Sequence, residues 1–326
     1  MPPVDAGGGR GLDRIVPQLF QLAFVLGLSP LVKGCIATAK ARFQGRRGPP
    51  LLQPYFDLAK LLRKEDLVPI GTSWLWRIAP LVYFTAPLVV TLLIPVLTDF
   101  PLYFAFTGDM LAGGFVLTLG GFFLVLAALD PSSPYGGVGS SRSRLVSLLA
   151  EPVLITVIFT VALTAHATVP YVVQKVLVRP AYLFYPSHLL ILLALFMVIL
   201  AETGHIPVDN PDSLHELSMI DEARALEYTG PRLALLRWGG AMKLTVLLVI
   251  LMNVLATPWG LTGAAGPFSL LAAAGAVLAK LLLAALALVL VEVSGAKIRL
   301  FRVPEFLGAA FGVALLAALA RVFGTY

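Results

Sequence analysis

The sequence has 326 residues, of which 58% are hydrophobic and only 13% are charged, and this composition excludes an ordinary soluble protein of that length. The formal net charge is +6, but the basic residues gather in connections between long apolar runs. This is the distribution expected from membrane topology, so we exclude nucleic-acid binding and predict an all-α, multi-pass protein embedded in the lipid bilayer.

The polar residues that usually hold metals or redox groups are scarce. Cys35 is the single cysteine, and by itself it can form neither a disulfide nor a cysteine-ligated iron–sulfur cluster within the chain. The four histidines show no metal-ligand spacing. We therefore predict that this chain has no catalytic residue, metal site or cofactor of its own.

Runs of roughly 20 apolar residues mark membrane-spanning helices. Residues 1–13, which include three consecutive glycines, are predicted to be a flexible tail, and residues 14–326 a single transmembrane domain. The predicted spans are about 15–39, 80–98, 109–129, 150–173, 183–203, 240–258, 268–291 and 304–323.

The sidedness of the chain is predicted from its 24 Lys and Arg residues. Most of them lie in the connections that follow the first, third, fifth and seventh spans, and such connections face the cytoplasm by the positive-inside rule. We predict cytoplasmic loops at about 40–79, 130–149, 204–239 and 292–303, with both termini outside the inner (plasma) membrane.

The first cytoplasmic connection contains a basic turn followed by an amphipathic pattern. Apolar residues between Leu51 and Leu62 alternate with charged ones, which indicates a helix lying on the membrane surface. Its basic face suits lipid headgroups or a partner protein, and the pattern leaves both interpretations open. The charged residues that could make these contacts are Arg42, Arg46 and Arg47 in the turn and Asp57, Lys60 and Lys64 in the helix.

In the second cytoplasmic connection, prolines and glycines between Pro131 and Gly139 predict that no continuous helix forms. Glu151 then begins the next helix, where a carboxylate meets the positive end of the helix dipole. The sequence leaves open whether Glu151 is a helix cap or a proton carrier.

The third connection, residues 202–231, is unusually acidic for a segment between two spans. Ser213 and Glu216 form a capping-box signature, and Gly230-Pro231 supplies a stop, so we predict a helix over 214–229. On such a helix Glu216 and Glu227 share one face. Glu202 and Asp209 precede it, in a segment that prolines keep extended or turned.

Charged residues also occur inside the later spans. Lys280 lies near the middle of its span, and Glu292 ends the same apolar run just before Lys297, Arg299 and Arg302. An ionisable residue at membrane depth indicates function by default, because its charge must be paired or neutralised. A structural ion pair between Glu292 and the following cations is the alternative.

Taken together, these motifs resemble those of the H-type membrane subunit of respiratory complex I and of its relatives in energy-converting membrane-bound NiFe hydrogenases such as formate hydrogenlyase. The resemblance covers the chain from about residue 15. It rests on Lys40-x-Arg42-x-x-x-Arg46-Arg47-Gly48-Pro49, Gln53-x-x-x-Asp57-x-x-Lys60, Lys64-Glu65, Glu202-Thr203, Pro207-x-Asp209 and Glu227-Tyr228-x-Gly230.

Departures from the quinone-reducing pattern after Asp209, together with Leu129-Asp130-x-x-Ser133-Pro134, favour the hydrogenase branch. The resemblance implies a non-catalytic coupling subunit whose partners are hydrogenase-like large and small subunits, an Fe–S subunit and antiporter-like membrane subunits. Those partners would carry the Fe–S clusters and the NiFe centre. The implied ion-coupling candidates are Glu151, Glu202, Asp209, Glu216, Glu227, Lys280 and Glu292, and the docking candidates are Arg42, Arg46, Arg47, Asp57, Lys60, Lys64, Lys297, Arg299 and Arg302.

Three alternatives stay open at this point. A quinone-site subunit of an NADH:quinone oxidoreductase shares the same motifs. A stand-alone secondary transporter would show repeated halves and interrupted helices, and we find no convincing repeat. A passive membrane anchor would not need carboxylates and a lysine at membrane depth.

Overall fold

The computed structural model describes residues 12–105, 108–178, 185–210, 219–263 and 266–324. Apart from one isolated parallel bridge between Thr98 and Thr262, the described regular elements are helical. Seven of the described helices are long and apolar enough to cross a membrane, and Pro186–Glu202 is apolar but only 17 residues long. The predicted all-α, multi-pass fold is confirmed, and the predicted number of eight spans is approximate.

The helices fall into long ones, which build the bundle, and short ones in the connections. The long helices are α1 (Leu12–Phe43), α3 (Trp74–Leu93), α4 (Met110–Leu129), α5 (Pro134–Ala165), α8 (Pro186–Glu202), α9 (Gly230–Val249), α10 (Pro267–Ser294) and α11 (Val303–Phe323). The short elements are α2 (Gln53–Leu62), α6 (Pro170–Leu177), the 3-10 turns η1 (Glu222–Ala225) and η3 (Leu300–Arg302), and the π-helix η2 (Ile250–Ala256), which continues α9.

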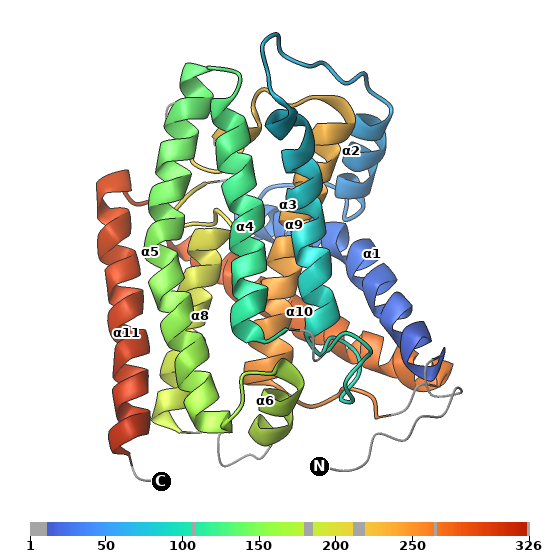
Figure 1. Ribbon diagram of the computed structural model, residues 1–326, viewed down its shortest axis with the longest axis vertical. Helices are drawn as coiled ribbons and strands as arrows, with labels where there is room; N and C mark the ends of the chain where they lie inside the picture. The colour runs from blue at the N-terminus through green and yellow to red at the C-terminus, as the bar shows by residue number, and fades with distance from the viewer. Residues whose placement is uncertain (1–11, 106–107, 179–184, 211–218, 264–265, 325–326) are drawn as a thin grey trace.

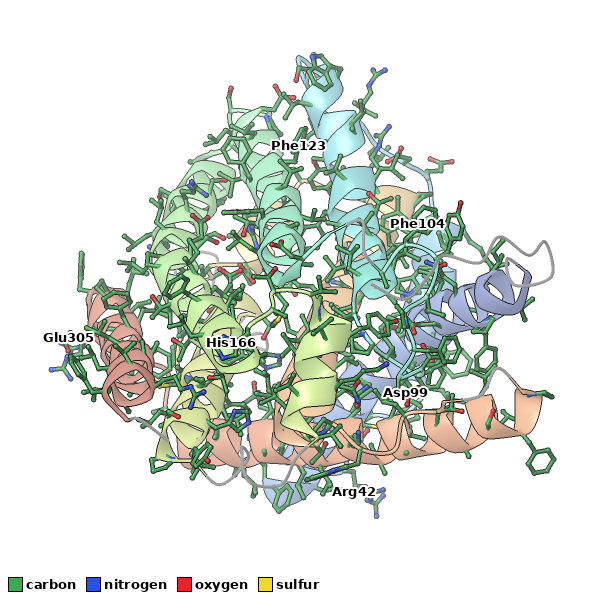
Figure 2. All side chains as sticks on the ribbon, turned by 60° about the horizontal axis from the view of Figure 1, so that its bottom comes forward. Arg42, Asp99, Phe104, Phe123, His166 and Glu305 are labelled. Carbon is green, nitrogen blue, oxygen red and sulfur yellow. The ribbon has the colours of Figure 1, made fainter. Side chains whose placement is uncertain are left out.

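The long helices form an upright group and an inclined pair. α3 packs against α4 and α9, and α11 packs against α5 and α8 at one side of the bundle (Figure 1). α1 and α10 lie against each other, and Figure 2 shows α10 running across the bundle. We call the end at which α3 and α9 begin the upper end, and the end at which they finish the lower end, as they stand in Figure 1.

Proline placement decides where α3 stops and how α1 is held. Pro95 disfavours the helical conformation at the preceding residue, and Ile94 is extended with ψ 150°, so α3 ends at Leu93 rather than at the predicted residue 98. Pro30 lies inside α1 and lacks the N–H that would bond to the carbonyl of Leu26. That carbonyl instead accepts a hydrogen bond from Trp238 Nε1 at 3.1 Å, which ties α1 to α9.

The prediction that residues 130–149 contain no continuous helix is wrong, because α5 begins at Pro134. A proline in the first turn of a helix loses no hydrogen bond, and its fixed φ suits that position. Gly139 faces Ala223 of η1 so closely that a Cβ on the glycine would collide with it. These residues therefore begin a helix and allow a close contact, whereas local rules predict a break.

The prediction of a helix over 214–229 is also wrong for the part that the structure describes. Residues 219–229 contain only the 3-10 turn η1, and Gly230-Pro231 begins α9 where we had expected a stop. Gly230 has φ +53°, and a Cβ there would collide with the carbonyl of Glu65. Residues 211–218, with Ser213 and Glu216, lie outside the described residues, as do residues 1–11 of the predicted tail over residues 1–13. The last two residues of that tail belong to α1.

Candidate functional site

Most of the predicted docking residues lie exposed at the ends of helices. The turn after α1 is held by Thr38 Oγ1, which donates to the carbonyl of Pro49 at 2.9 Å. Asp57 of α2 accepts a hydrogen bond from Gln53 Nε2 at 2.9 Å, on the half-buried side of that helix. The exposed basic candidates are Arg42, Arg46, Arg47, Lys60, Lys64, Arg299 and Arg302.

The carboxylate of Glu292, at the end of α10, is almost completely buried, with 1% of its side chain exposed. The alternative of an ion pair with the cations that follow it is wrong: His205 Nδ1 lies 2.6 Å from Oε1, and Lys40 Nζ lies 3.4 Å from Oε2. Three segments far apart in the sequence therefore meet at one carboxylate. An imidazole and a carboxylate at hydrogen-bond distance form a pair that can share or exchange a proton.

Asp209 is the second buried carboxylate, and its partner is Lys297. The Lys297 Nζ lies 2.7 Å from Oδ1 of Asp209, so this lysine is not a free docking residue. Oδ2 accepts backbone N–H groups from Ile220 at 3.0 Å and Asp221 at 3.2 Å. The connection after α8 is thus fastened both to the segment after α10 and to the turn that leads into η1.

Glu202, the last residue of α8, is paired with Lys243 of α9. Lys243 Nζ lies 2.7 Å from Oε2 of Glu202 and 3.0 Å from its backbone carbonyl oxygen. Only 11% and 12% of the Lys243 and Glu202 side chains are exposed, so the pair is largely withdrawn from solvent. We call Lys40–Glu292, Lys243–Glu202 and Lys297–Asp209 the three lysine–carboxylate pairs.

A further ion pair, in which the arginine is buried, lies at η1. Arg224, with 7% of its side chain exposed, donates to Oδ1 of Asp221 at 2.6 Å. Ser143 of α5 contacts the same oxygen at 3.4 Å. Sequence reasoning did not single out Arg224 or His205, although a polar residue close to an intramembrane carboxylate is itself a signal of function.

The remaining predicted coupling residues are less enclosed. Glu151 does not begin a helix, because it lies well inside α5, where it pairs with Arg144 at 3.5 Å. Both of these side chains are about one-third exposed or less, at 35% for Arg144 and 27% for Glu151. Glu227 is half-buried in the connection before α9, and Glu216 lies outside the described residues.

Next to Glu227, an aromatic cluster closes the upper end of α3. The rings of Trp76 and Tyr228 stack at 4.5 Å, and Arg232 lies 4.9 Å above the Trp76 ring while pairing with Asp66 at 2.9 Å. The Tyr228 hydroxyl donates to the Trp76 carbonyl at 3.0 Å. Burial raises the pKa of Tyr228, so its phenol stays protonated and continues to donate.

Lys280 has surroundings of another kind. Its ammonium group donates to Asn253 Oδ1 at 3.1 Å, to the Thr257 carbonyl at 2.6 Å and to the Trp259 carbonyl. Asn253 is 1% exposed and belongs to the π-helix η2, and its Nδ2 donates to the Val96 carbonyl at 2.8 Å. Within the described part of the chain, Lys280 thus donates to neutral oxygens.

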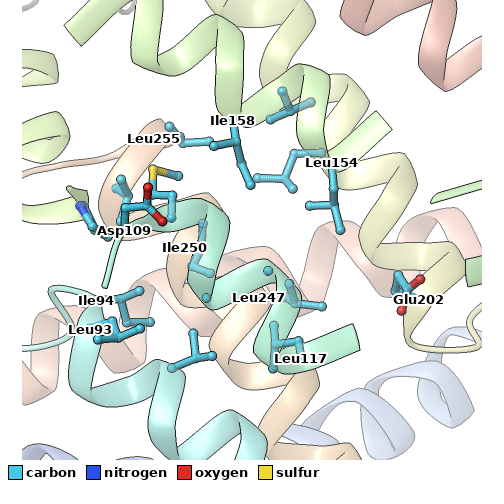
Figure 3. A pocket seen from close by; sticks show the side chains of 18 of the residues that line it. Leu93, Ile94, Asp109, Leu117, Leu154, Ile158, Glu202, Leu247, Ile250 and Leu255 are labelled. Atoms are coloured by element: carbon cyan, nitrogen blue, oxygen red, sulfur yellow. The ribbon is translucent and has the colours of Figure 1, made fainter. Parts of the chain in front are cut away.

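A narrow cavity of about 50 Å³ lies between α3, α4, α5, α8 and α9. Glu202 and Lys243 line one end of it, and Asp109, at the start of α4, lines the other. Figure 3 shows Asp109 and Glu202 on opposite sides of a group of leucine and isoleucine side chains. A separate open groove of about 410 Å³ lies at the end of α1, lined by Cys35, Thr38, Ala39, Arg42, Phe43 and Leu51.

The described residues contain no cluster of three or more His, Cys, Asp or Glu side chains placed to hold a metal ion. What they hold together is a set of buried carboxylates, each facing a cation. Such an arrangement can redistribute protons and charge when the field around it changes.

The sequence matches the family described as NADH dehydrogenase over residues 18–323. It is 30% identical to formate hydrogenlyase subunit 4 of Escherichia coli (strain K12) over 305 residues, which are 93% of this chain and 97% of that relative. It is 33% identical to hydrogenase-4 component C of the same organism over 247 residues, 76% of either chain. It is 29% identical to the H-type subunit of the NADH-quinone oxidoreductase of Orientia tsutsugamushi (strain Ikeda) over 171 residues, 51% of this chain and 48% of that one.

A solved structure of similar fold is a chain of the membrane-bound sulfane sulfur reductase (MBS), an archaeal respiratory membrane complex. The TM-score is 0.81, and the match covers 94% of this chain and 99% of that chain at 21% sequence identity. At that identity the likeness bears on the fold. The resemblance found from the sequence motifs is confirmed by these matches.

Proposed function

The chain belongs to the NADH dehydrogenase family, and we propose that it is the membrane-anchoring and coupling subunit of a multisubunit oxidoreductase of the group 4 NiFe hydrogenase or formate hydrogenlyase type. In this role it links an electron-transfer arm to proton or sodium translocation. Hydrogenase-like subunits and an Fe–S subunit sit on it, and antiporter-like membrane subunits lie beside it. The Fe–S clusters and the NiFe centre belong to those partners.

The observation that supports this role best is the set of three lysine–carboxylate pairs. Lys40–Glu292 joins the ends of α1 and α10, Lys243–Glu202 joins α9 to the end of α8, and Lys297–Asp209 joins the segments that follow α10 and α8. A change in one carboxylate's protonation therefore acts on the packing of two elements at once. Burying a charge without a partner costs several kcal/mol, so protonation and pairing are coupled. A redox change in a neighbouring subunit can therefore be passed on as a movement of protons or of helix ends.

The exposed basic residues provide the surface for the electron-transfer arm. Arg42 lies in the last turn of α1, and Arg46 and Arg47 follow that helix. Arg299 and Arg302 follow α10, so both groups lie close to the buried Lys40–Glu292 pair in the sequence. Arginine makes bidentate, charge-assisted hydrogen bonds to carboxylates. We propose that this surface faces the cytoplasm and binds an acidic face of the arm.

Purification of the tagged chain from its native membrane tests this assignment. We expect companion subunits that contain nickel and Fe–S clusters, and we expect Arg46→Glu with Arg47→Glu to release them while the chain stays in the membrane. Lys175→Glu, on α6 near the lower end, is the matched control. A chain that purifies alone and transports a solute would overturn the proposal in favour of a secondary transporter.

A second candidate function is the quinone-site subunit of an NADH:quinone oxidoreductase. The similarity to the H-type subunit of NADH-quinone oxidoreductase and the open groove at the end of α1 favour it. In that case the purified complex contains NADH-oxidising subunits and no nickel. A Leu51→Trp substitution, which narrows the groove, would then raise the KM for quinone, whereas the hydrogenase hypothesis predicts unchanged turnover.

The acidic connection gives a direct test of coupling. Glu227→Gln removes a charge from the half-buried connection before α9, and we expect it to lower ion transport per turnover while assembly survives. Glu216→Gln is expected to act in the same way. Unaltered coupling of both variants in proteoliposomes would contradict a role for these two residues.

A further inference from the structure

Two features separate the three lysine–carboxylate pairs from the lower end of the bundle. The first is the cavity that begins at Glu202 and Lys243. Between that pair and Asp109, the lining includes Leu117, Leu154 and Leu247. An apolar cavity of this kind stays dry, because water inside it finds too few hydrogen-bond partners.

A dry apolar stretch strongly hinders the passage of ions. A proton or a metal cation needs water or polar side chains along its way, and the loss of hydration costs many kcal/mol in a medium of low dielectric constant. Asp109, at the far end, is already engaged: its Oδ1 accepts the N–H of Ala112 at 2.8 Å and caps α4. The cavity is thus closed to ions although it is not completely filled.

The second feature is the ammonium group of Lys280. The three lysine–carboxylate pairs are formally neutral, whereas Lys280 is held by Asn253 Oδ1 and two backbone carbonyl oxygens. Among the ion pairs of the described residues, none includes Lys280. Its positive charge is therefore stabilised by dipoles without being cancelled by a carboxylate, and such a charge repels cations that approach it.

The local backbone fixes this charge in place. The π-helix η2 ends at Ala256, and the following turn passes through Gly260 at φ +79°, where a Cβ would press on Ala276 at 3.3 Å. The turn brings the Thr257 and Trp259 carbonyls to Lys280. Gln174 of α6 holds the carbonyl between them, that of Pro258, at 2.7 Å.

We propose that the lower half of this chain is a cation barrier, formed by the dry cavity at Leu117 and Leu247 and by the uncancelled charge of Lys280. It isolates the three lysine–carboxylate pairs from the aqueous phase at the lower end. Charge that moves at those pairs then does not cross the membrane through this chain. The barrier is formed by the chain's own residues and does not depend on the identity of the redox partners.

Passive proton flux through the full-length chain tests the barrier. The chain is reconstituted in liposomes loaded with a pH-sensitive dye, and a potassium diffusion potential set by valinomycin drives proton uptake. We expect the wild type to match protein-free liposomes. Leu247→Asn and Leu117→Asn, which give water polar partners inside the cavity, are each expected to raise the rate several-fold.

Lys280→Gln removes the charge but keeps an amide donor for the three oxygens, and it is also expected to raise the rate several-fold. The control is Leu283→Asn, since Leu283 lies on α10 with 61% of its surface exposed and lines neither feature. Circular dichroism and gel filtration establish that each variant is folded. With two cavity variants, the failure of one to fold leaves the other to decide.

Proton conduction by the wild type would overturn the proposal, as would folded cavity and Lys280 variants that leak no more than Leu283→Asn. A faster proton uptake confined to the cavity variants would show that Lys280 is not part of the barrier. A faster uptake confined to Lys280→Gln would show that the cavity is not part of it. Loss of redox coupling in the intact complex has no bearing on these rates, so failure of the barrier and failure of the proposed function are distinguishable.

Discussion

Four lysines of this chain lie in two regions that surround a cation differently. Lys40, Lys243 and Lys297 each face a carboxylate, at 3.4, 2.7 and 2.7 Å. Lys280 faces an amide oxygen and two carbonyl oxygens. A paired cation can lose its partner's charge when that partner is protonated, whereas the described partners of Lys280 carry no charge that protonation could cancel. The first region is therefore suited to respond to protonation of a carboxylate, and the second is not.

Breaking a pair should have the largest effect on stability. Lys243→Met leaves the Glu202 carboxylate buried without its cation, and the expected loss is about 3–5 kcal/mol of unfolding free energy. In the double variant Glu202→Gln with Lys243→Met, the uncompensated charge is absent, so much of the loss should be regained. Unfolding by sodium dodecyl sulfate measures the stability of both variants. A double variant as unstable as Lys243→Met would show that the pairing does not matter.

Removal of Lys280 should have a smaller effect, because no opposite charge is left behind. Lys280→Met removes three hydrogen bonds to neutral oxygens, and the expected loss is about 1–3 kcal/mol. Lys280→Gln should retain part of the stability that Lys280→Met loses. If Lys280→Met were as costly as Lys243→Met in the same unfolding assay, the distinction between the two regions would be lost.

Substitutions at two glycines test how tightly the chain is packed around the η1 turn and around the cavity. Gly139 lies against Ala223 with no room for a Cβ, so Gly139→Ala should destabilise the chain by about 1–3 kcal/mol. Gly114 lines the cavity, and the nearest atom to an added Cβ is Ile158 Cδ1 at 3.8 Å. Gly114→Ala should therefore stabilise the chain, by about 0.5–1 kcal/mol. Thermal unfolding in detergent measures both changes in stability. Changes of the same sign would contradict the predicted difference in packing.

The smallest effect is expected for a neutral contact at the upper end. Tyr228→Phe removes the hydrogen bond to the Trp76 carbonyl but keeps the stacked ring, and the expected loss is about 1 kcal/mol. Tyr103→Phe, at a side chain that is 61% exposed, is the control and should change nothing. A loss as large as that of Lys243→Met would show that location outweighs the chemistry of the contact.

The sequence was sufficient to predict the elements whose signal is local. Apolar runs indicated the spans, and the alternating pattern after Leu51 indicated α2, which spans Gln53–Leu62. Proline and glycine were misinterpreted at Pro134 and Gly230, because in this chain they begin helices that press closely on neighbouring backbone. Local rules treat such residues as breaks unless the tertiary contact is known.

The candidate site could be predicted only in part. Glu202, Asp209 and Glu292 stand out as carboxylates in apolar surroundings, but their partners lie far along the chain. Lys243 is 41 residues from Glu202, and Lys297 is 88 residues from Asp209. No sequence signal connects such residues before the helices are packed. The neutral oxygens around Lys280 were equally hidden, since two of them belong to the backbone of a turn.

The most direct test of the central claim is the number of ions translocated per turnover by the intact complex in proteoliposomes. Glu292→Gln changes the most deeply buried carboxylate of the three pairs, and Glu151→Gln changes one whose pair with Arg144 is more exposed. We predict that Glu292→Gln retains redox turnover but loses most of its ion translocation, whereas Glu151→Gln keeps both. Normal translocation per turnover in an assembled Glu292→Gln complex would contradict the account.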